Sequence, residues 1–559
     1  MSITEVLLLT ALLWPVLLSA MLVTGQSQRF LLPLAPVPLL ALAVFAASGQ
    51  SLDAPWLLTA LRFGFEPQMQ PFVLLTALVW LAAGVYRSTE REAIEQPSTA
   101  FTLFWLACFW GNTLLVLAAE MVAFYLGFTL MSLSAWGLVR HYQTEQAAYA
   151  ARIYLIMALV GEVLVLAGLL LAVAENGSSA FNPPVMLPET FWLLTLGFGI
   201  KAGVIVLHVW LPLAHPAAPV AASAVLSGVM LKAGVLGWLL FLPDNGLDIG
   251  WFAYGFIGAG LLAMFYGVAV GLTQQDPKTI LAYSSISQMG WLTLAVGLWL
   301  LTDQSALLWA IIGAFVLHHG LNKAALFLGV GAYKQTPSWL LLGLLALPAA
   351  ALAGLPMSSG YLAKEWLKVP VYALNPVIAN VLMLAGVATT LIMLHFLFTL
   401  YRAGRPRAGL AVGFSPVMLV IVPLVLLAPV LVLWQLDAET LTQLLGISSW
   451  LQAMGMILLG GGLYLAGRYW LQLRWAIPAG DILVGFAVIA RWVQTGFDGL
   501  KRAEVRIENI AAAVGRQTQQ QAQRMTSRLQ TIETGLRDWP HFSLLLMLLA
   551  LLLAVLLAL

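Results

Sequence analysis

The sequence predicts an all-α polytopic membrane protein with about sixteen transmembrane helices. Of its 559 residues, 61% are hydrophobic and only 9% are charged, and the mean hydropathy is +0.92. Apolar runs of about 20 residues, the length that crosses a bilayer, recur from end to end. Lys201 and Lys232 lie inside such runs. A lysine at that depth costs roughly 3 kcal/mol and is tolerated only where it faces protein or water.

The apolar runs define the helices in order along the chain. We expect them at residues 4–24, 30–48, 70–86, 99–118, 119–139, 150–173, 190–211, 220–242, 249–272, 279–302, 305–333, 338–370, 377–402, 411–435, 448–470 and 541–559. The first run follows Glu5 and has no basic segment before it, so we interpret it as a retained helix rather than a cleaved signal. The predicted parts are N-terminal helices (1–98), a core (99–410), peripheral helices (411–477), an amphipathic arm (478–540) and an anchor (541–559).

Loop charges orient these helices in the cell inner (cytoplasmic) membrane. Basic residues follow the third, fifth, ninth, eleventh and thirteenth helices: Arg87, Arg91, Arg140, Arg152, Lys278, Lys334, Arg402, Arg405 and Arg407. Acidic residues occupy the opposite loops, with Arg62 as the main exception: Asp53, Glu66, Glu175, Glu189, Asp244, Asp248, Asp303, Asp437 and Glu439. The positive-inside rule then places the basic loops in the cytoplasm and the N-terminus outside.

The region 478–540 is amphipathic rather than uniformly apolar. Apolar residues recur at helical spacing from Phe486 to Leu536, with basic residues between them. Asp481 is a candidate N-cap, and Pro540 ends the pattern before the last apolar run. A continuous helix of this length would extend about 85 Å. We predict a lateral helix on the cytoplasmic membrane surface; a simple interfacial anchor and a coiled-coil arm are the alternatives.

Prolines interrupt the apolar stretch that carries the two lysines. His215-Pro216 and Pro219 lie between Lys201 and Lys232. Broken backbone at membrane depth is allowed only where it is buried in protein or lines a hydrated cavity. Charged groups around a broken intramembrane helix therefore indicate an ion path.

Four ordered motifs make this chain resemble a known family. They are GIKAGVIVLHVWLPLAHPAAPVAASAVLSGVMLKAG, DPKTILAYSSISQMG, HHGLNKAALFLGVGA and GLPMSSGYLAKEWL. They resemble the proton-conducting membrane subunits shared by respiratory complex I, Mrp-type sodium/proton antiporters and membrane-bound hydrogenases. The resemblance extends from about Glu120 to Trp366, and the long arm with its anchor is similar to L-type subunits. Leu213, Val220 and Gln288 depart from the usual family residues.

The resemblance implies two inverted repeats, each with one broken helix, and a chain of proton-carrying groups. The breaks are expected at His215, Pro216 and Pro219, and at Pro356 to Gly360. Glu120 is expected to pair with Lys201, and Glu162 to supply the acidic position of the sixth helix. The implied proton path then continues through Lys232, His319, Lys323, Lys364 and Glu365.

Electrostatics supports these roles independently of the family. A carboxylate that approaches or leaves a buried lysine switches it between holding and releasing a proton. Structural alternatives stand beside each role: Glu120–Lys201 as a static pair, Lys232 as a snorkelling side chain, and His208 and His395 as packing residues. His318 and His319 point to different faces, so we expect at most one on the path. Arg152 and Lys278 are expected to be loop-end charges.

Other functional classes fit the sequence less well. Intramembrane histidines could ligate haem, but no repeated pair stands out, and Cys108 alone cannot form a cluster. There is no glycine-rich dinucleotide fingerprint. We therefore expect no cofactor, no metal and no nucleic acid, and we leave open whether the chain belongs to an enzyme such as NADH-quinone oxidoreductase. The expected partners are lipid, protons, Na⁺ as an open option, and other membrane subunits. The alternatives are a stand-alone secondary transporter and a subunit of a carbon-uptake complex.

Overall fold

The computed structural model describes residues 2–23, 28–47, 49–54, 61–90, 98–243, 250–302, 304–404, 417–470 and 477–483. One compact unit comprises residues 1–52 and 62–480, and a second comprises 53–61 and 481–559. Only residues 53, 54, 61 and 481–483 of the second unit are described. The predicted lateral helix (478–540) and anchor (541–559) therefore lie almost entirely outside the described residues.

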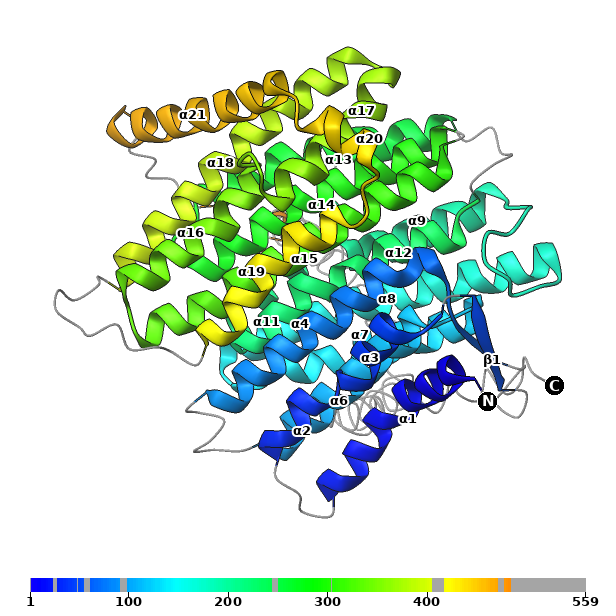
Figure 1. Ribbon diagram of the computed structural model, residues 1–559. Helices are drawn as coiled ribbons and strands as arrows, with labels where there is room; N and C mark the ends of the chain where they lie inside the picture. Colours follow the sequence, from blue (N-terminus) through cyan, green and yellow to red (C-terminus); the bar gives the residue numbers. More distant parts are fainter. Residues whose placement is uncertain are drawn as a thin grey trace, which may run out of the picture. The chain divides into compact units, whose positions relative to one another are not determined.

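The N-terminal part is helical with one short sheet (Figure 1). The predicted helix 30–48 is divided at a turn just before Val37. A two-stranded sheet follows, and Phe63 also forms a bridge with Ala118, which ties this part to the core. The elements are α1 (Ile3–Val23), α2 (Gln28–Leu34), α3 (Val37–Phe45), β1 (Gln50–Ala54), β2 (Leu61–Phe65), η1 (Pro67–Met69) and α4 (Gln70–Thr89).

The core consists of long apolar helices and two helices that are interrupted. In its first half lie α6 (Thr99–Val116), α7 (Met121–Val139), α8 (Glu145–Asn176), α9 (Pro188–Ala202), α10 (Trp210–Ala217), α11 (Val220–Val225), the π-helical turn η2 (Leu226–Met230) and α12 (Leu231–Phe241). In its second half lie α13 (Gly250–Gly271), α14 (Pro277–Leu301), α15 (Ser305–Gln335), α16 (Trp339–Ala353), α17 (Ser359–Leu374) and α18 (Pro376–Ala403).

The core is centred on α11–α12, α14 and α15. Nearly all residues of these helices are buried, whereas in α13 and α18 only half of the residues are buried. Small residues allow close backbone approach, as expected where lipid removes much of the hydrophobic drive for association. A Cβ on Gly260 of α13 would lie 2.5 Å from the carbonyl oxygen of Gly290 on α14, so this helix pair requires glycine there.

Three further helices complete the described part: α19 (Met418–Leu433), α20 (Ala438–Leu444) and α21 (Ile447–Trp470). The first two are bent by 113° at a short break. Among the described residues, 11 helices are long and apolar enough to cross a membrane, or 12 if the bent pair forms one span. The chain is thus a multi-pass membrane protein, as predicted, while the number of sixteen spans stays a prediction.

Candidate functional site: a buried lysine path between two broken helices

Lys201 lies at the end of the first half of a broken helix. α9 ends at Ala202, Gly203 takes a left-handed conformation (φ 69°), and the chain resumes as α10 at Trp210. The break therefore comes earlier than predicted. His215 and Pro216 lie inside α10, and Pro219 is the N-cap of α11 rather than part of the break. Gly203 ends α9, because glycine adopts the left-handed conformation without strain. The prolines come later in the sequence.

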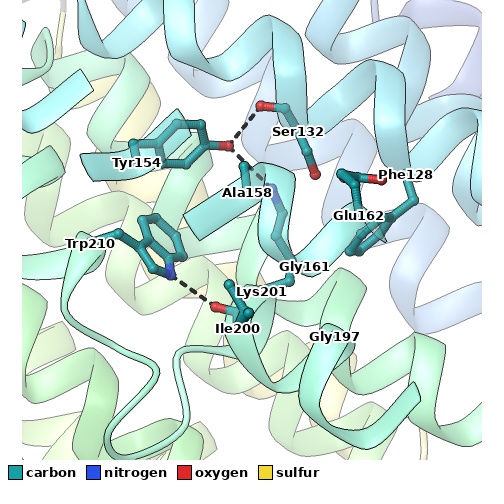
Figure 2. A pocket seen from close by; sticks show the side chains of 10 residues that line it. All are labelled: Phe128, Ser132, Tyr154, Ala158, Gly161, Glu162, Gly197, Ile200, Lys201 and Trp210. Carbon is teal, nitrogen blue, oxygen red and sulfur yellow. Dashed lines mark hydrogen bonds between the residues drawn. The ribbon is translucent and has the colours of Figure 1, made fainter. Parts of the chain in front are cut away.

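The ammonium group of Lys201 points into a small cavity (Figure 2). Its Nζ donates to the hydroxyl of Tyr154 at 3.3 Å, and that hydroxyl donates to the carbonyl of Ser132 at 2.9 Å. The cavity offers about 10 Å³ for the centre of a water molecule. That volume suits about one water, which could bridge polar groups that do not touch directly.

Glu162 of α8 lines the same cavity as Lys201. Its Oε2 accepts a 2.5 Å hydrogen bond from the Thr129 hydroxyl, while Oε1 has no hydrogen-bond partner in the part of the chain that the structure describes. The charges of Glu162 and Lys201 interact, yet the two groups form no direct ion pair within the described ranges. This arrangement couples an acid and an amine electrostatically without locking them together.

The predicted pair of Glu120 with Lys201 is not formed. Glu120 is the N-cap of α7, and its carboxylate accepts from the backbone N–H groups of Val122 and Ala123 at 2.8 and 2.6 Å. Burial raises the pKa of Glu120, and these hydrogen bonds and Arg62 oppose the shift. The residue that reaches Glu162 from the same helix is Thr129, nine residues further and about 13 Å along the axis.

Lys232 and Lys323 belong to one cluster of hydrogen-bonded groups. The Nζ of Lys232 donates to the Ser227 carbonyl at 2.6 Å, and the Ser227 hydroxyl bonds that of Ser285 at 2.8 Å. The Ser285 hydroxyl donates to the Leu281 carbonyl at 3.0 Å, which also accepts from Lys323 at 2.8 Å. All of these side chains are buried, so the two lysines share one polar network inside an apolar core.

His318 and His319 lie where Lys232, Lys323 and Lys364 converge. Both rings are fully buried, and both experience the charges of Lys232 and Lys364. Neither ring nitrogen of His319 has a hydrogen-bond partner among the described residues. His318 instead contacts the second broken helix, because its Nδ1 is 3.0 Å from the hydroxyl of Ser359. Both histidines are therefore placed near the path, whereas we expected at most one.

The second break repeats the local geometry of the first. α16 ends at Ala353, and Gly354 takes the left-handed conformation (φ 95°). Three residues further, Met357 also has a positive φ of 64°, as Val206 does at 75° three residues after Gly203. A positive φ is strained in any residue that has a side chain, and most in a β-branched one such as Val206, so both breaks hold strained backbone.

The other predicted residues of the second break lie close to it. Pro356 is inside the break, as expected. Gly360 lies in the first turn of α17, and a Cβ there would overlap the carbonyl oxygen of Ala351 and approach the ring of His318 to 2.6 Å. Glycine is thus required for α16, α17 and α15 to meet.

Lys364 and Glu365 are adjacent on α17 but make different contacts. The Nζ of Lys364 donates to the Leu352 carbonyl at 2.6 Å and lies 5.0 Å from the centre of the Trp291 ring. Leu352 is in the last turn of α16, where carbonyls lack intrahelical partners. Glu365 instead forms an ion pair with Lys368 at 2.6 Å. Lys364 therefore faces the broken helix, and Glu365 has its own cation.

Sequence reasoning missed the hydroxyl groups that connect the charged residues. These are Thr129, Tyr154, Ser227, Ser284 and Ser285. Two of them are the adjacent serines of the DPKTILAYSSISQMG motif, which was used only as a family signal. Because hydroxyl groups are common on apolar helices, the sequence does not distinguish these five residues from others. Their contacts in the structure identify them. Within the described ranges, no group of three or more His, Cys, Asp or Glu side chains is placed to hold a metal ion.

Comparison with known proteins confirms the predicted family resemblance. Residues 118–393 match the family described as NADH:quinone oxidoreductase/Mrp antiporter, TM. The chain is 32% identical to Hydrogenase-4 component B of Escherichia coli (strain K12), over 56% of this chain and 51% of that protein. It is 27% identical to NADH-quinone oxidoreductase subunit M of Rickettsia typhi (strain ATCC VR-144 / Wilmington), over 58% and 69% of the two chains. The matches to the first curated relatives span about half of those proteins.

A solved structure confirms the fold. The chain resembles one from the Mrp complex of Dietzia sp. DQ12-45-1b with a TM-score of 0.64 and 20% identity, covering 82% of this chain and 98% of that one. At that identity the likeness supports the all-α membrane architecture and leaves the chemistry to be argued from the residues.

Proposed function

We propose that this chain, whose residues 118–393 match the NADH:quinone oxidoreductase/Mrp antiporter membrane family, translocates protons as the antiporter-like subunit of a larger membrane complex. The observation that carries the proposal is the shared cavity of Glu162 and Lys201 at the end of a broken helix. A carboxyl group and an amine that interact without a direct bond can exchange a proton through one water.

The proposed path leads from this cavity through the centre of the core. Lys201 takes a proton from the cavity water, and its release is favoured when Glu162 is neutral. Lys232 receives the proton and releases it toward the neutral amine of Lys323 across a gap that the Ser227 and Ser285 hydroxyls line, where water can carry it. His319 and Lys364 then continue the path to the second break, where Glu365 and Lys368 form its last charged pair. Glu120 has no proposed role in transfer, because its carboxylate caps a helix.

Two buried glutamates provide a matched test. The tagged complex is reconstituted in liposomes, and proton movement is followed with a pH-sensitive dye under an imposed membrane potential. Glu162→Gln should abolish transport because the amide cannot change charge, whereas Glu120→Gln should retain it because the amide oxygen can still cap α7. Transport at the normal rate by Glu162→Gln, with assembly intact, would contradict the proposal.

Substitution of Lys201 tests whether its proton actually moves. Lys201→Met should abolish transport, and Lys201→Arg should also fail because a guanidinium does not release its proton in a protein. Normal transport by Lys201→Arg would show that Lys201 supplies only a fixed charge. Gel filtration of each variant complex separates a lost proton step from lost assembly.

We further propose that the host is a multi-subunit complex in the cell inner membrane, with the N-terminus outside. The relatives are named as parts of a hydrogenase, of NADH-quinone oxidoreductase and of an antiporter, and these names leave the host open. Mass spectrometry of the subunits that copurify with the tagged chain identifies the host complex. Redox subunits would indicate coupling to electron transfer, and small antiporter subunits would indicate exchange with Na⁺. Purification of an active chain without any partner would favour the stand-alone transporter.

A further inference from the structure

His215 is a buried histidine that the path above does not use. It lies in α10, is completely inaccessible, and stacks on Phe327 with ring centres 4.6 Å apart. Neither of its ring nitrogens has a hydrogen-bond partner among the described residues. Three lysines act on its charge from three different helices: Lys278 of α14, Lys323 of α15 and Lys232 of α12. A buried, unpartnered imidazole among amines is in position to exchange protons with them.

Lys278 is a buried lysine at the end of the bundle, not the exposed loop charge that we expected. Its Nζ donates to the carbonyl of Ala218, the C-cap of α10 and three residues beyond His215, at 2.5 Å. Only 6% of Lys278 is exposed. Two residues earlier, Asp276 pairs with Lys334 at 3.8 Å, and these side chains are 41% and 48% exposed. Lys278 therefore lies between the solvent-exposed pair Asp276–Lys334 and the buried interior.

A second carboxylate also acts on Lys278 from inside the protein. Glu90 forms a buried 2.6 Å ion pair with Arg87, and its charge reaches Lys278 together with those of Asp276 and Lys334. Charges of both signs thus act on the amine of Lys278. The basic loops on this side of the bundle place it, by the sequence prediction, at the cytoplasmic face.

We propose that Lys278 and His215 form the proton connection between the cytoplasmic surface and the central lysines; this rests on the proposed function. A proton from surface water forms an N–H bond at the neutral amine of Lys278. That N–H bond breaks as one forms at a His215 ring nitrogen, and the other ring nitrogen releases a proton to the amine of Lys323. One positive charge moves inward at each step, and no other reactant is needed. Small water-filled gaps can carry the proton where the groups do not touch.

The test uses the reconstituted complex and the same proton assay. His215→Phe keeps an aromatic ring against Phe327 and removes both nitrogens, and it should lower transport at least tenfold with assembly intact. His395→Phe is the matched control: His395 is a membrane histidine on α18 that bonds the Gln274 carbonyl at 2.9 Å, outside the proposed route. That control should transport normally. A normal rate for His215→Phe would overturn the inference, and Lys201→Met measured in parallel shows whether the proposed function itself still stands.

Chemical rescue provides a second readout that depends on sidedness. Lys278→Cys should be inactive, and reaction of its thiol with aminoethyl methanethiosulfonate restores an amine at the end of a chain of similar length. The native Cys108 has no exposed surface, whereas position 278 keeps 6% exposure and lies beside the exposed Asp276, so labelling should be confined to the new thiol. Recovery should occur when the reagent is added from the cytoplasmic face. Full activity of unlabelled Lys278→Cys, or recovery only from the opposite face, would overturn the connection even if His215→Phe proved unstable.

Discussion

Replacing Gly234 by alanine should separate the two helices that carry Lys201 and Lys232. Gly234 lies two residues after Lys232 on α12, where a Cβ would be 2.5 Å from the carbonyl oxygen of Phe198 and 2.6 Å from the backbone nitrogen of Ala202 on α9. Both contacts are backbone atoms, so no flexible side chain can move aside. Ordinary van der Waals contact begins at 3.4 Å, so α9 and α12 would have to shift apart by about 0.9 Å to accommodate the methyl group.

A shift of that size has two expected consequences. Overpacking of this kind costs about 1–3 kcal/mol of stability. A misplacement of about 1 Å between reacting groups can slow a step by about 100-fold, so proton transport should fall more than stability. The assays are the melting temperature of the purified complex and its proton transport in liposomes.

The matched control for Gly234→Ala is Gly258→Ala on α13. A Cβ at Gly258 meets nothing within 4 Å, so the change should stabilise its helix by up to about 1 kcal/mol and leave transport unchanged. Equal melting temperatures and equal rates for the two variants would refute the claim that close contact of α9 and α12 positions the lysines.

Three further outcomes are expected. Thr129→Val should slow transport because it removes a hydrogen bond to the Glu162 carboxylate, worth about 1.5–3 kcal/mol, while Thr129→Ser should retain most of the rate. Ser285→Ala should interrupt the network between Lys232 and Lys323 and slow transport without loss of assembly; an unchanged rate would place the proton route elsewhere. Truncation after Ala479 should leave the core folded and weaken attachment of neighbouring subunits, and normal copurification of those subunits would show the predicted lateral helix to be dispensable.

The sequence predicted the fold class and the family, and it drew attention to the buried lysines, because each lysine in an apolar run is conspicuous; their part in proton transfer stays a prediction. It did not predict which acid faces Lys201. Glu120 was chosen because the family resemblance implied it. The structure instead uses Glu120 as the N-cap of α7, which starts at Met121, and places Glu162 in the cavity of Lys201. Both glutamates lie in apolar runs, so the sequence pattern alone does not tell them apart.

The position of the first break was wrong for a related reason. Proline is the strongest sequence signal for a helix interruption, and it drew the prediction to His215-Pro216. The helix is interrupted at Gly203, and the predicted residues His215 and Pro216 lie inside α10, which follows the interruption. The interruption depends on a left-handed conformation that many glycines of the chain do not adopt. The second break was predicted correctly because Pro356 and Gly360 lie next to Gly354 in sequence.

Three of the buried lysines share a form of stabilisation that suits proton transfer. Lys364 donates to the Leu352 carbonyl in the last turn of α16, Lys278 to the Ala218 carbonyl at the end of α10, and Lys232 to the Ser227 carbonyl in the π-helical turn. A carbonyl accepts from an ammonium group and from a neutral amine alike, so it does not fix the charge of the lysine as a bound carboxylate would. Helix ends supply such carbonyls at membrane depth without an added charge. The irregular backbone therefore holds the lysines in place while leaving each free to gain or lose a proton.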